Sequence, residues 1–410
     1  MTELVIDRLG HRGDGIASTA DGKPLFVPYT LPGEIVDLDV QGGAMRLSRI
    51  VSPSPDRIEP VCTHFGTCGG CLLQHFAPTP YADFKRRLVI DALADRGLTP
   101  EVGETRLVPP GSRRRATFAG IMAGRHPLVG FNERGSHRLV SLDECPVIKP
   151  QLLAALPALT AITGLVTPRK GGLDLTVTLT SGGLDVSVTG MAARDVDRLR
   201  LQLIELAARF DLARLSTGGE AIVERRAATI EIDGVVVALP PGGFLQASQE
   251  AEAIMGELVT AAIPAKAKRV ADLFSGVGTF SLRLARLAEV LALEGESGAV
   301  MALDRAARGM TGRHRITAEK RDLARRPLVE KELEKIDAVV FDPPRAGAAE
   351  QSLWLSRSKV PTVVAVSCNP ATLARDLRTL VDGGYHIDTV TPIDQFLWSS
   401  HVEVVAVLKR

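Results

Sequence analysis

The chain has 410 residues, and at about 150 residues per domain this length predicts two to three domains. Hydrophobic residues make up 45% and charged residues 24%, which is typical of a folded globular protein and excludes disordered, collagen-like and coiled-coil chains. With 49 basic and 48 acidic residues the formal net charge is +1, so the overall charge does not indicate a nucleic-acid partner.

Residues 1–54 alternate short apolar runs with glycine-containing turns, which predicts a small all-β barrel. The same segment begins with acidic residues and has no long apolar run, so it does not resemble a secretory signal. No later apolar stretch reaches the about 20 uninterrupted residues of a membrane span. We therefore expect a cytoplasmic protein without a membrane partner.

A proline-containing segment, SPSPDRIEP, predicts a linker, and residues 55–240 are expected to form an α+β middle domain. Helical apolar spacing predicts helices in YADFKRRLVIDALADRGL, with Gly97 as the stop signal, and in DVDRLRLQLIELAARF. The runs LDLTVTLT, LDVSVTG and GVVVALP predict strands of this domain.

Four of the five cysteines fall in this middle segment. Five residues separate Cys62 from Cys68, two separate Cys68 from Cys71, and Cys145 follows 74 positions after Cys71. In a reducing compartment such a group favours metal ligation over disulfides. Four thiolates suit either a tetrahedral zinc ion or a 4Fe-4S cluster, and the spacing alone leaves both open.

Seven arginines lie between residues 105 and 138 with a single acid, Glu133, which gives this stretch a net charge of +6. They are Arg106, Arg113, Arg114, Arg115, Arg125, Arg134 and Arg138. Guanidinium groups match phosphate geometry and stack on bases, so the stretch predicts an RNA-binding face. An ordinary solvated surface is the alternative.

Residues 241–410 change to an alternation of strands and helices, with predicted strands in RVADLF, EVLALE, DAVVFD and TVVAVS. This rhythm predicts a doubly wound parallel sheet, a Rossmann-like α/β domain with its ligand crevice at the carboxyl ends of the strands.

The run VADLFSGVGTF predicts a strand, a glycine turn and a helix. Gly276 and Gly278 would let the backbone approach a ligand, although close packing of strand and helix also selects glycine. Glu294 follows Gly276 by 18 residues, near the spacing of about 20 expected for a carboxylate that binds a ribose. Asp322 and Asp342 follow the next two strand regions, so carboxylates are expected to converge on one crevice. Asp322 could instead open a helix.

Cys368 stands between the predicted strand TVVAVS and a helix that begins near Pro370. A helix amino terminus lowers the pKa of a nearby thiol, which predicts a nucleophile. A small buried core residue is the alternative.

Together these motifs resemble the RNA uracil-5-methyltransferases, which use S-adenosylmethionine. The resemblance rests on DLFSGVGTF, Glu294, FDPPRAGA, SCNPATLARD and the terminal HVE, and it extends over essentially the whole chain. LGHRGDGIA and LFVPYTLPGE resemble a TRAM domain, while CTHFGTCGGC and DECP resemble the family's iron-sulfur ligands. A TRAM domain together with a cluster points to the bacterial 23S ribosomal RNA branch rather than the transfer-RNA branch. The expected order is a TRAM RNA-binding barrel, a middle domain with the cluster loop, and a class I methyltransferase domain.

The resemblance implies that Cys368 attacks carbon 6 of uracil and that Glu403 later removes the proton from carbon 5, giving 5-methyluridine. Without the resemblance, the alternating pattern of HVEVVAVLKR would make Glu403 a solvent-facing strand residue. The positions that match the family's cofactor contacts are Gln246, Phe274, Thr279, Glu294, Asp322 and Asp342. After the glutamine, the family pattern continues to an asparagine, where this chain has Ser248. The family's 4Fe-4S cluster would be held by Cys62, Cys68, Cys71 and Cys145 in a structural role.

A transfer-RNA substrate, or an RNA-binding protein on a catalytically inactive methyltransferase fold, are the alternatives. An amino-methyltransferase would have an aromatic residue where Arg345 follows the two prolines and would need no nucleophile. A radical enzyme would need cysteines separated by three and two residues instead of five and two. We expect a monomer.

Overall fold

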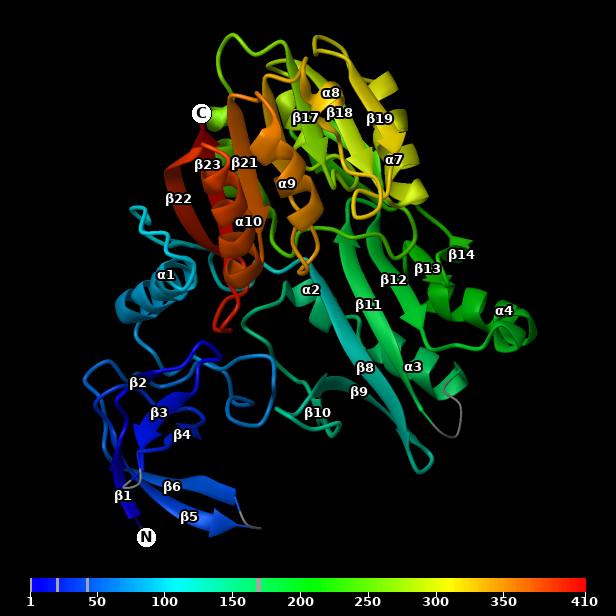
Figure 1. The fold of residues 1–410 in the computed structure, drawn as a ribbon. Helices are drawn as coiled ribbons and strands as arrows, with labels where there is room; N and C mark the ends of the chain where they lie inside the picture. The colour runs from blue at the N-terminus through cyan, green and yellow to red at the C-terminus, as the bar shows by residue number, and fades with distance from the viewer. Residues whose placement is uncertain (1, 20–21, 42–43, 167–170) are drawn as a thin grey trace.

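The amino-terminal region is built from two small antiparallel sheets in the computed structural model, which describes residues 2–19, 22–41, 44–166 and 171–410 (Figure 1). One sheet has the order β1-β5-β6 and the other β2-β3-β4. Their bounds are Thr2–Val5 (β1), Arg8–Leu9 (β2), Gly15–Ser18 (β3), Pro24–Val27 (β4), Ile35–Gln41 (β5) and Ala44–Ser52 (β6). A small apolar core, which includes Ile6, Val27 and Val36, lies between them. The all-β prediction for this region is confirmed.

A seven-stranded sheet forms the middle region, with the order β10-β9-β8-β11-β12-β13-β14. The strands are β8 (Arg115–Ala123), β9 (His126–Asn132), β10 (Leu139–Ser141), β11 (Gly172–Thr180), β12 (Gly183–Thr189), β13 (Arg214–Thr217) and β14 (Glu220–Glu224). Three helices accompany it: α2 (Pro150–Leu153), α3 (Leu156–Val166) and α4 (Ala193–Arg209). Apolar residues that alternate along β11 and β12, such as Val177 and Val186, face the helices' apolar sides and form this region's core.

The carboxyl-terminal sheet has eight strands in the order β19-β18-β17-β20-β21-β23-β22-β7. The strands are β7 (Arg106–Leu107), β17 (Arg269–Leu273), β18 (Glu289–Glu294), β19 (Ile316–Lys320), β20 (Ala338–Phe341), β21 (Thr362–Ser367), β22 (His386–Asp394) and β23 (Glu403–Lys409). Strands β17 to β21 pair in parallel, and β23 is inserted antiparallel beside β21. The strand order reverses at β17, which lies between β18 and β20, and such a switch point opens a ligand crevice at the carboxyl ends of the strands.

Helices cover this sheet on both sides (Figure 1). They are α1 (Pro78–Ala94), α5 (Gln249–Ala262), α6 (Ser281–Leu284), α7 (Ser297–Arg308), α8 (Glu330–Leu333), α9 (Ala349–Arg357) and α10 (Pro370–Asp382). The central strands are apolar on both faces, and every residue of β21 is buried, as a doubly wound sheet requires. No helix of the described residues is long and apolar enough to cross a membrane.

Two stretches that the sequence assigned to the middle domain pack on the carboxyl-terminal sheet instead. Helix α1 contributes Val89 and Leu93 to a core shared with α10, and β7 pairs with β22. The hairpin of β15 (Thr229–Ile232) and β16 (Val235–Ala238) packs into the core on the other side of the sheet. Sequence order alone does not determine which sheet an edge strand or covering helix joins, so the boundaries at 54 and 240 stay predictions.

Candidate active site

Strand ends bring three of the predicted functional side chains to one edge of the carboxyl-terminal sheet. Asp342 follows β20 directly, Cys368 follows β21 directly, and Glu403 is the first residue of β23. Ser367 pairs with Val404 across β21 and β23, so the residues on either side of this pair are neighbours across the two strands. The parallel sheet thus places a thiol and two carboxylates at its switch-point edge.

Two glutamines connect the carboxylates in a hydrogen-bonded chain. Gln246 Nε2 donates to Asp342 Oδ2 at 2.9 Å. Gln395 Nε2 donates both to Gln246 Oε1 at 3.0 Å and to Glu403 Oε2 at 2.5 Å. Gln246, Gln395 and Glu403 are only 3%, 4% and 2% exposed. The sequence analysis missed Gln395, and the only signal was a polar residue in the otherwise largely apolar run PIDQFLW.

Burial changes the proton affinity of both carboxyl groups. It raises the pKa of Asp342 to about 7, against a hydrogen bond from Gln246 that favours the charged form. The pKa of Glu403 lies well above its usual range because of burial and the nearby charge of Asp342, whereas Gln395 and Arg345 act in the opposite direction. A carboxyl group with a raised pKa is suited to accept a proton near neutral pH.

The environment of Cys368 differs from the sequence expectation. Burial raises the pKa of its thiol, and the charges of Glu403 and Asp342 raise it further, while a hydrogen bond and the charge of Arg345 oppose them. The predicted lowering by the following helix is therefore wrong in its net direction. Arg345, which follows the two prolines after β20, is the cation that favours the thiolate here.

Asn369 explains why the helix amino terminus does not dominate. It is the residue that caps α10, and its side-chain Oδ1 accepts from Ala371 N at 3.2 Å. One of the free N–H groups at this helix end is thus already occupied by the cap. Cys368 lies just before the cap, and the net direction of its pKa follows from burial first and then from the charges of Glu403, Asp342 and Arg345.

The two glycines of the turn after β17 could serve either the approach of a ligand or the close packing of strand and helix, and the structure distinguishes them. A Cβ on Gly278 would lie 2.5 Å from the end of the Leu303 side chain of α7, and its backbone adopts a φ of +102°, so the local structure of the turn favours glycine there. A Cβ on Gly276 would meet nothing within 4 Å, and its backbone adopts a φ of +55°. Gly276 N donates to Glu294 Oε2 at 2.9 Å, which fixes the carboxylate against the turn. Gly276 is therefore the glycine that borders open space.

Two polar groups beside this turn have no hydrogen-bond partner among the described residues, namely Asp272 Oδ1 and Ser275 Oγ. Asp272 is fully buried in β17, where burial raises its pKa to about 7 although Ser281 Oγ donates to its Oδ2 at 2.5 Å. Unpaired buried polar atoms call for a polar ligand, because leaving them unpaired costs about 1 to 3 kcal/mol each. The sequence analysis did not select Asp272 or Ser275, although both lie in the run ADLFSG.

The remaining predicted cofactor residues are less connected. Phe274 and Thr279 are half-buried in the glycine turn, and Phe274 has a φ of +60°. Asp322 lies two residues beyond β19 with its side chain 55% exposed, and its Oδ1 accepts from Ala324 N at 3.1 Å within its own turn. Ser248 caps α5 by accepting from Ala251 N at 3.2 Å.

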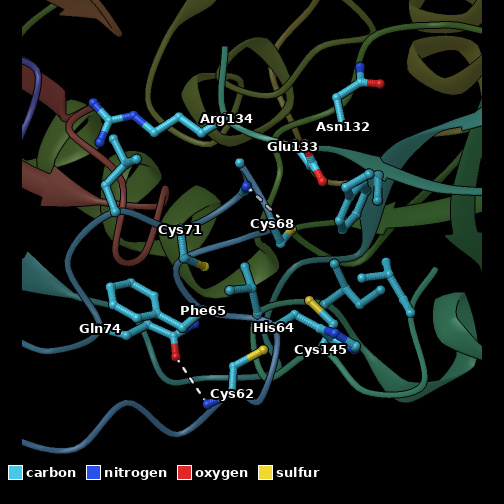
Figure 2. A pocket seen from close by; sticks show the side chains of 18 of the residues that line it. Cys62, His64, Phe65, Cys68, Cys71, Gln74, Asn132, Glu133, Arg134 and Cys145 are labelled. Atoms are coloured by element: carbon cyan, nitrogen blue, oxygen red, sulfur yellow. Dashed lines mark hydrogen bonds between the residues drawn. The ribbon is translucent and has the colours of Figure 1, made fainter. Parts of the chain in front are cut away.

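The other four cysteines line one cavity of about 820 Å³, which residues of β8, β9 and β11 also line (Figure 2). Cys62, Cys68 and Cys71 come from the loop between β6 and α1, and Cys145 comes from the loop between β10 and α2. Within the described ranges, no three His, Cys, Asp or Glu side chains are grouped closely enough to hold a metal ion.

Burial raises the pKa of three of these thiols, and that of Cys71 reaches about 12. The charge of Cys145 also raises the pKa of all three thiols, and the charges of Cys62 and Cys68 raise the pKa of Cys71. Backbone and side-chain donors partly compensate: Gly70 N lies 3.4 Å from Cys68 Sγ, and Gln74 hydrogen-bonds Cys71 and accepts from Cys62 N at 3.1 Å. Four thiolates would coexist here only beside a strong positive charge.

The predicted arginine face is only partly on the surface. Arg114 is buried and pairs with the buried Glu252, so its assignment to an RNA-binding face is wrong. Its backbone N also donates to Ala247 O at 2.8 Å, which attaches the middle region to the segment that carries Gln246. Arg134 pairs with Asp14 at 2.5 Å. The exposed members of the set include Arg106, Arg125 and Arg138.

Sequence and structure comparisons identify related proteins over the whole chain. The family described as tRNA (Uracil-5-)-methyltransferase matches residues 192–410, and the TRAM domain matches residues 2–42. An uncharacterised RNA methyltransferase of Rhizobium meliloti is 49% identical over 99% of both chains. The 23S rRNA (uracil(1939)-C(5))-methyltransferase of Chromohalobacter salexigens is 34% identical over 99% of this chain and 89% of its own length. The crystal structure of the Pyrococcus abyssi tRNA (uracil-54, C5)-methyltransferase, in complex with S-adenosyl-L-homocysteine, shares the fold with a TM-score of 0.73 at 23% identity, covering 99% of each chain.

Proposed function

The chain belongs to the S-adenosylmethionine-dependent RNA uracil-5-methyltransferases, and we propose that it makes 5-methyluridine in 23S ribosomal RNA through a covalent adduct on Cys368. The observation that carries this proposal is that Cys368 and Glu403 are neighbours at the ends of two paired strands. Hydrogen bonds through Gln246 and Gln395 link Glu403 to Asp342. A nucleophile and a proton acceptor on one edge are the two groups that this chemistry needs.

The reaction divides between these two side chains. The Cys368 thiolate forms a bond to carbon 6 of uracil, and the displaced ring electrons give an enolate with a nucleophilic carbon 5. S-adenosylmethionine, when bound, supplies an electrophilic methyl group to that carbon. Glu403 then takes the proton from carbon 5, the electrons of that bond restore the double bond between carbons 5 and 6, and the sulfur leaves carbon 6 as a thiolate. The target uridine must be flipped out of its helix to reach this crevice.

The residues near the glycine turn are suited to hold the cofactor. Glu294 is held against Gly276 at the end of β18, where it would accept from the ribose hydroxyls. The unpaired Asp272 Oδ1 and Ser275 Oγ provide further polar contacts beside it. Gln246, Phe274, Thr279 and Asp342 complete the proposed set, and Asp322 would contribute only from an exposed turn.

We assign the cysteine cavity to a 4Fe-4S cluster held by Cys62, Cys68, Cys71 and Cys145. All four thiols line one cavity of about 820 Å³. The resemblance of CTHFGTCGGC and DECP to the family's iron-sulfur ligands favours the cluster over a zinc ion. The cluster's positive iron atoms would supply the charge that these buried thiolates need. Methyl transfer requires no electron, so the proposed role is to hold the loop of residues 62–71 against the middle region. Iron and sulfide analysis of anaerobically purified protein tests this, and a zinc-containing, iron-free protein would contradict it.

Ribosomal RNA is proposed as the substrate because a relative that is 34% identical over 99% of this chain is named a 23S rRNA (uracil(1939)-C(5))-methyltransferase. The structural neighbour acts on transfer RNA, which keeps tRNA as the second candidate. Mass spectrometry of digested 23S rRNA and tRNA, from cells with and without the gene, distinguishes them. We expect 5-methyluridine to disappear at one 23S position only. Loss from tRNA alone would favour the second candidate.

The covalent step has its own test in purified protein. Cys368→Ala should lower methyl transfer by roughly 10⁴-fold or more. Wild-type protein should form a stable adduct with RNA that carries 5-fluorouridine, because a fluorine on carbon 5 cannot be removed as a proton. An active alanine variant, or the absence of any adduct, would reject the mechanism.

A further inference from the structure

Gln395 belongs to no motif identified in the sequence, yet it contacts two functional residues. It follows β22 directly and is 4% exposed. Its amide N–H groups donate to Glu403 Oε2 at 2.5 Å and to Gln246 Oε1 at 3.0 Å. Both lie at the sheet edge that carries Asp342, Cys368 and Glu403, which we call the catalytic edge. Its own Oε1 has no partner among the described residues. Each known contact of this side chain therefore serves the proposed base and the glutamine that binds Asp342.

The residue before Gln395 is fixed from the opposite side. Asp394 is fully buried, and its Oδ1 accepts from Lys85 Nζ of α1 at 2.8 Å. Its other oxygen accepts from the Tyr81 hydroxyl, which in turn accepts from Trp398 N at 2.7 Å. A buried, paired and hydrogen-bonded charge of this kind fixes one backbone geometry, because any other leaves a charge without a partner. Gln395 thus projects from an anchored position.

The loop between Gln395 and Glu403 is anchored along its length. Lys85 Nζ also donates to the carbonyl oxygens of Phe396 and His401. Leu72 N and Leu73 N donate to Trp398 O at 2.7 and 3.1 Å. These contacts all come from α1 and the segment before it, so the outer side of the loop is held there while its ends present Gln395 and Glu403 inward.

We propose that Gln395 is a positioning residue that holds the Glu403 carboxylate in the orientation required to take the proton from carbon 5. The proposal rests on the proposed function, because it takes Glu403 as the base. An N–H donated to a carboxylate stabilises the charged, proton-accepting form and fixes the direction of its free oxygen. The second N–H joins the base to Gln246 and so sets its distance from Asp342.

Several charged groups face Glu403 besides this amide. Asp342 follows β20 and raises the proton affinity of Glu403, while Arg345 lowers it. Cys368 lies beside it after β21 and interacts with its charge. Lys85 and Asp394 lie behind the loop and are paired with each other. Among these groups, Gln395 is the one that donates a hydrogen bond to the Glu403 carboxylate.

The test compares two steps of one reaction in the full-length, cluster-containing protein. Gln395→Met keeps most of the volume and removes both N–H donors, and Gln202→Met on the exposed face of α4 is the matched control. Adduct formation with 5-fluorouridine RNA measures the steps through methyl transfer. Turnover on ordinary uridine RNA also includes proton removal. Gln395→Asn, whose amide is one methylene too short, provides a second variant if the methionine variant folds poorly.

We expect Gln395→Met to form the 5-fluorouridine adduct at nearly the wild-type rate but to turn over about tenfold to a hundredfold more slowly. Covalent adduct should then accumulate even on ordinary RNA. The rising limb of the turnover–pH profile should move to higher pH, because the lost donor favoured the charged base. Equal slowing of both steps at every pH, or no slowing at all, would overturn the proposal. Activity in Cys368→Ala would instead reject the proposed function itself.

Discussion

The catalytic edge and the cysteine cavity are organised in opposite ways. At the edge, Asp342 and Cys368 follow two parallel strands, Glu403 begins the antiparallel strand beside them, and each carboxylate already has a hydrogen-bond partner. In the cavity, the thiols come from loops, and the charges of neighbouring thiols raise the pKa of Cys68 and Cys71. The fold alone therefore preorganises the first site, whereas the proposed bound cluster would supply positive charge to the thiolates of the second.

One loop nevertheless belongs to both sites. Ser400 and His401 line the cysteine cavity, and Glu403 at the catalytic edge follows only two residues later. Arg345 also reaches His401, with 3.4 Å between Nη2 and Nε2. A disturbance in the cavity can thus reach the proposed base through a few residues of backbone.

After Cys368→Ala, the largest effect is expected from Glu403→Gln, which removes the proposed base from the preorganised site. Turnover should fall by about 10²- to 10⁴-fold, while adduct formation with 5-fluorouridine RNA continues. Radioactive methyl transfer and gel-shift detection of the adduct measure the two steps. Loss of both steps would show that the edge needs Glu403 for its structure and not as a base.

The pH dependence of the wild-type enzyme tests the same residue. A base acts only when deprotonated, and burial and Asp342 raise the pKa of Glu403. Proton removal should therefore increase with pH through a range above that of an ordinary glutamate and be slow in mild acid. Turnover that is independent of pH from mild acid to neutrality would contradict this assignment.

A smaller but still large effect is expected at the anchor behind the shared loop. Lys85→Met leaves Asp394 as a buried charge without its cation, which should lower the free energy of unfolding by about 3 to 5 kcal/mol. Denaturant titration measures this. Removing both charges, in Lys85→Met with Asp394→Leu, should cost less than the single change. A single variant within about 1 kcal/mol of wild type would mean that the loop does not depend on this anchor.

The sequence predicted that Asp342 and Cys368 follow neighbouring strands, because strand ends are visible in a sequence. Apolar runs located β17, β18, β20 and β21, and the topology of a doubly wound sheet then brings Asp342 and Cys368 together. The net direction of the Cys368 pKa was not predictable, because it depends first on burial and then on the charge of Glu403, which is adjacent only across β21 and β23.

Residues that act through tertiary contacts were also missed. Gln395 and Asp272 have no local pattern that separates them from other polar residues near strands. Arg114 was misassigned for the same reason, because a run of three arginines does not reveal that one of them is buried against Glu252 of α5. The net charge of a sequence segment predicts the surface potential only when all of its charged side chains are exposed.

A moderate effect is expected in the cysteine cavity from Gln74→Ala. Gln74 is buried and contacts two of the four cysteines, Cys62 and Cys71. Loss of such a supporting partner typically weakens metal binding about tenfold to a hundredfold. Iron retained after a timed chelator challenge measures this, with Gln202→Ala as the exposed control. Unchanged retention would mean that the cavity, like the catalytic edge, holds its shape without this support.

The smallest effect concerns Arg134 at the rim of the cysteine cavity, where two roles predict different measurements. Its guanidinium pairs with Asp14 at 2.5 Å and lies over the Tyr29 ring, and the arginine and aspartate side chains are 28% and 11% exposed. A structural link between the amino-terminal and middle regions should give a coupling energy of about 1 kcal/mol in a double-mutant cycle with Asp14→Ala.

A phosphate contact would behave differently from such a link. If Arg134 is structural, Arg134→Ala should leave the salt dependence of RNA binding unchanged, whereas Arg125→Ala, at an exposed position, should reduce the slope by about one if it binds a phosphate. A reduced slope for Arg134→Ala without coupling to Asp14 would instead return it to the RNA face. The cavity rim would then be open to RNA and not closed against the amino-terminal sheets, and the cavity would lie next to the substrate as the catalytic edge does.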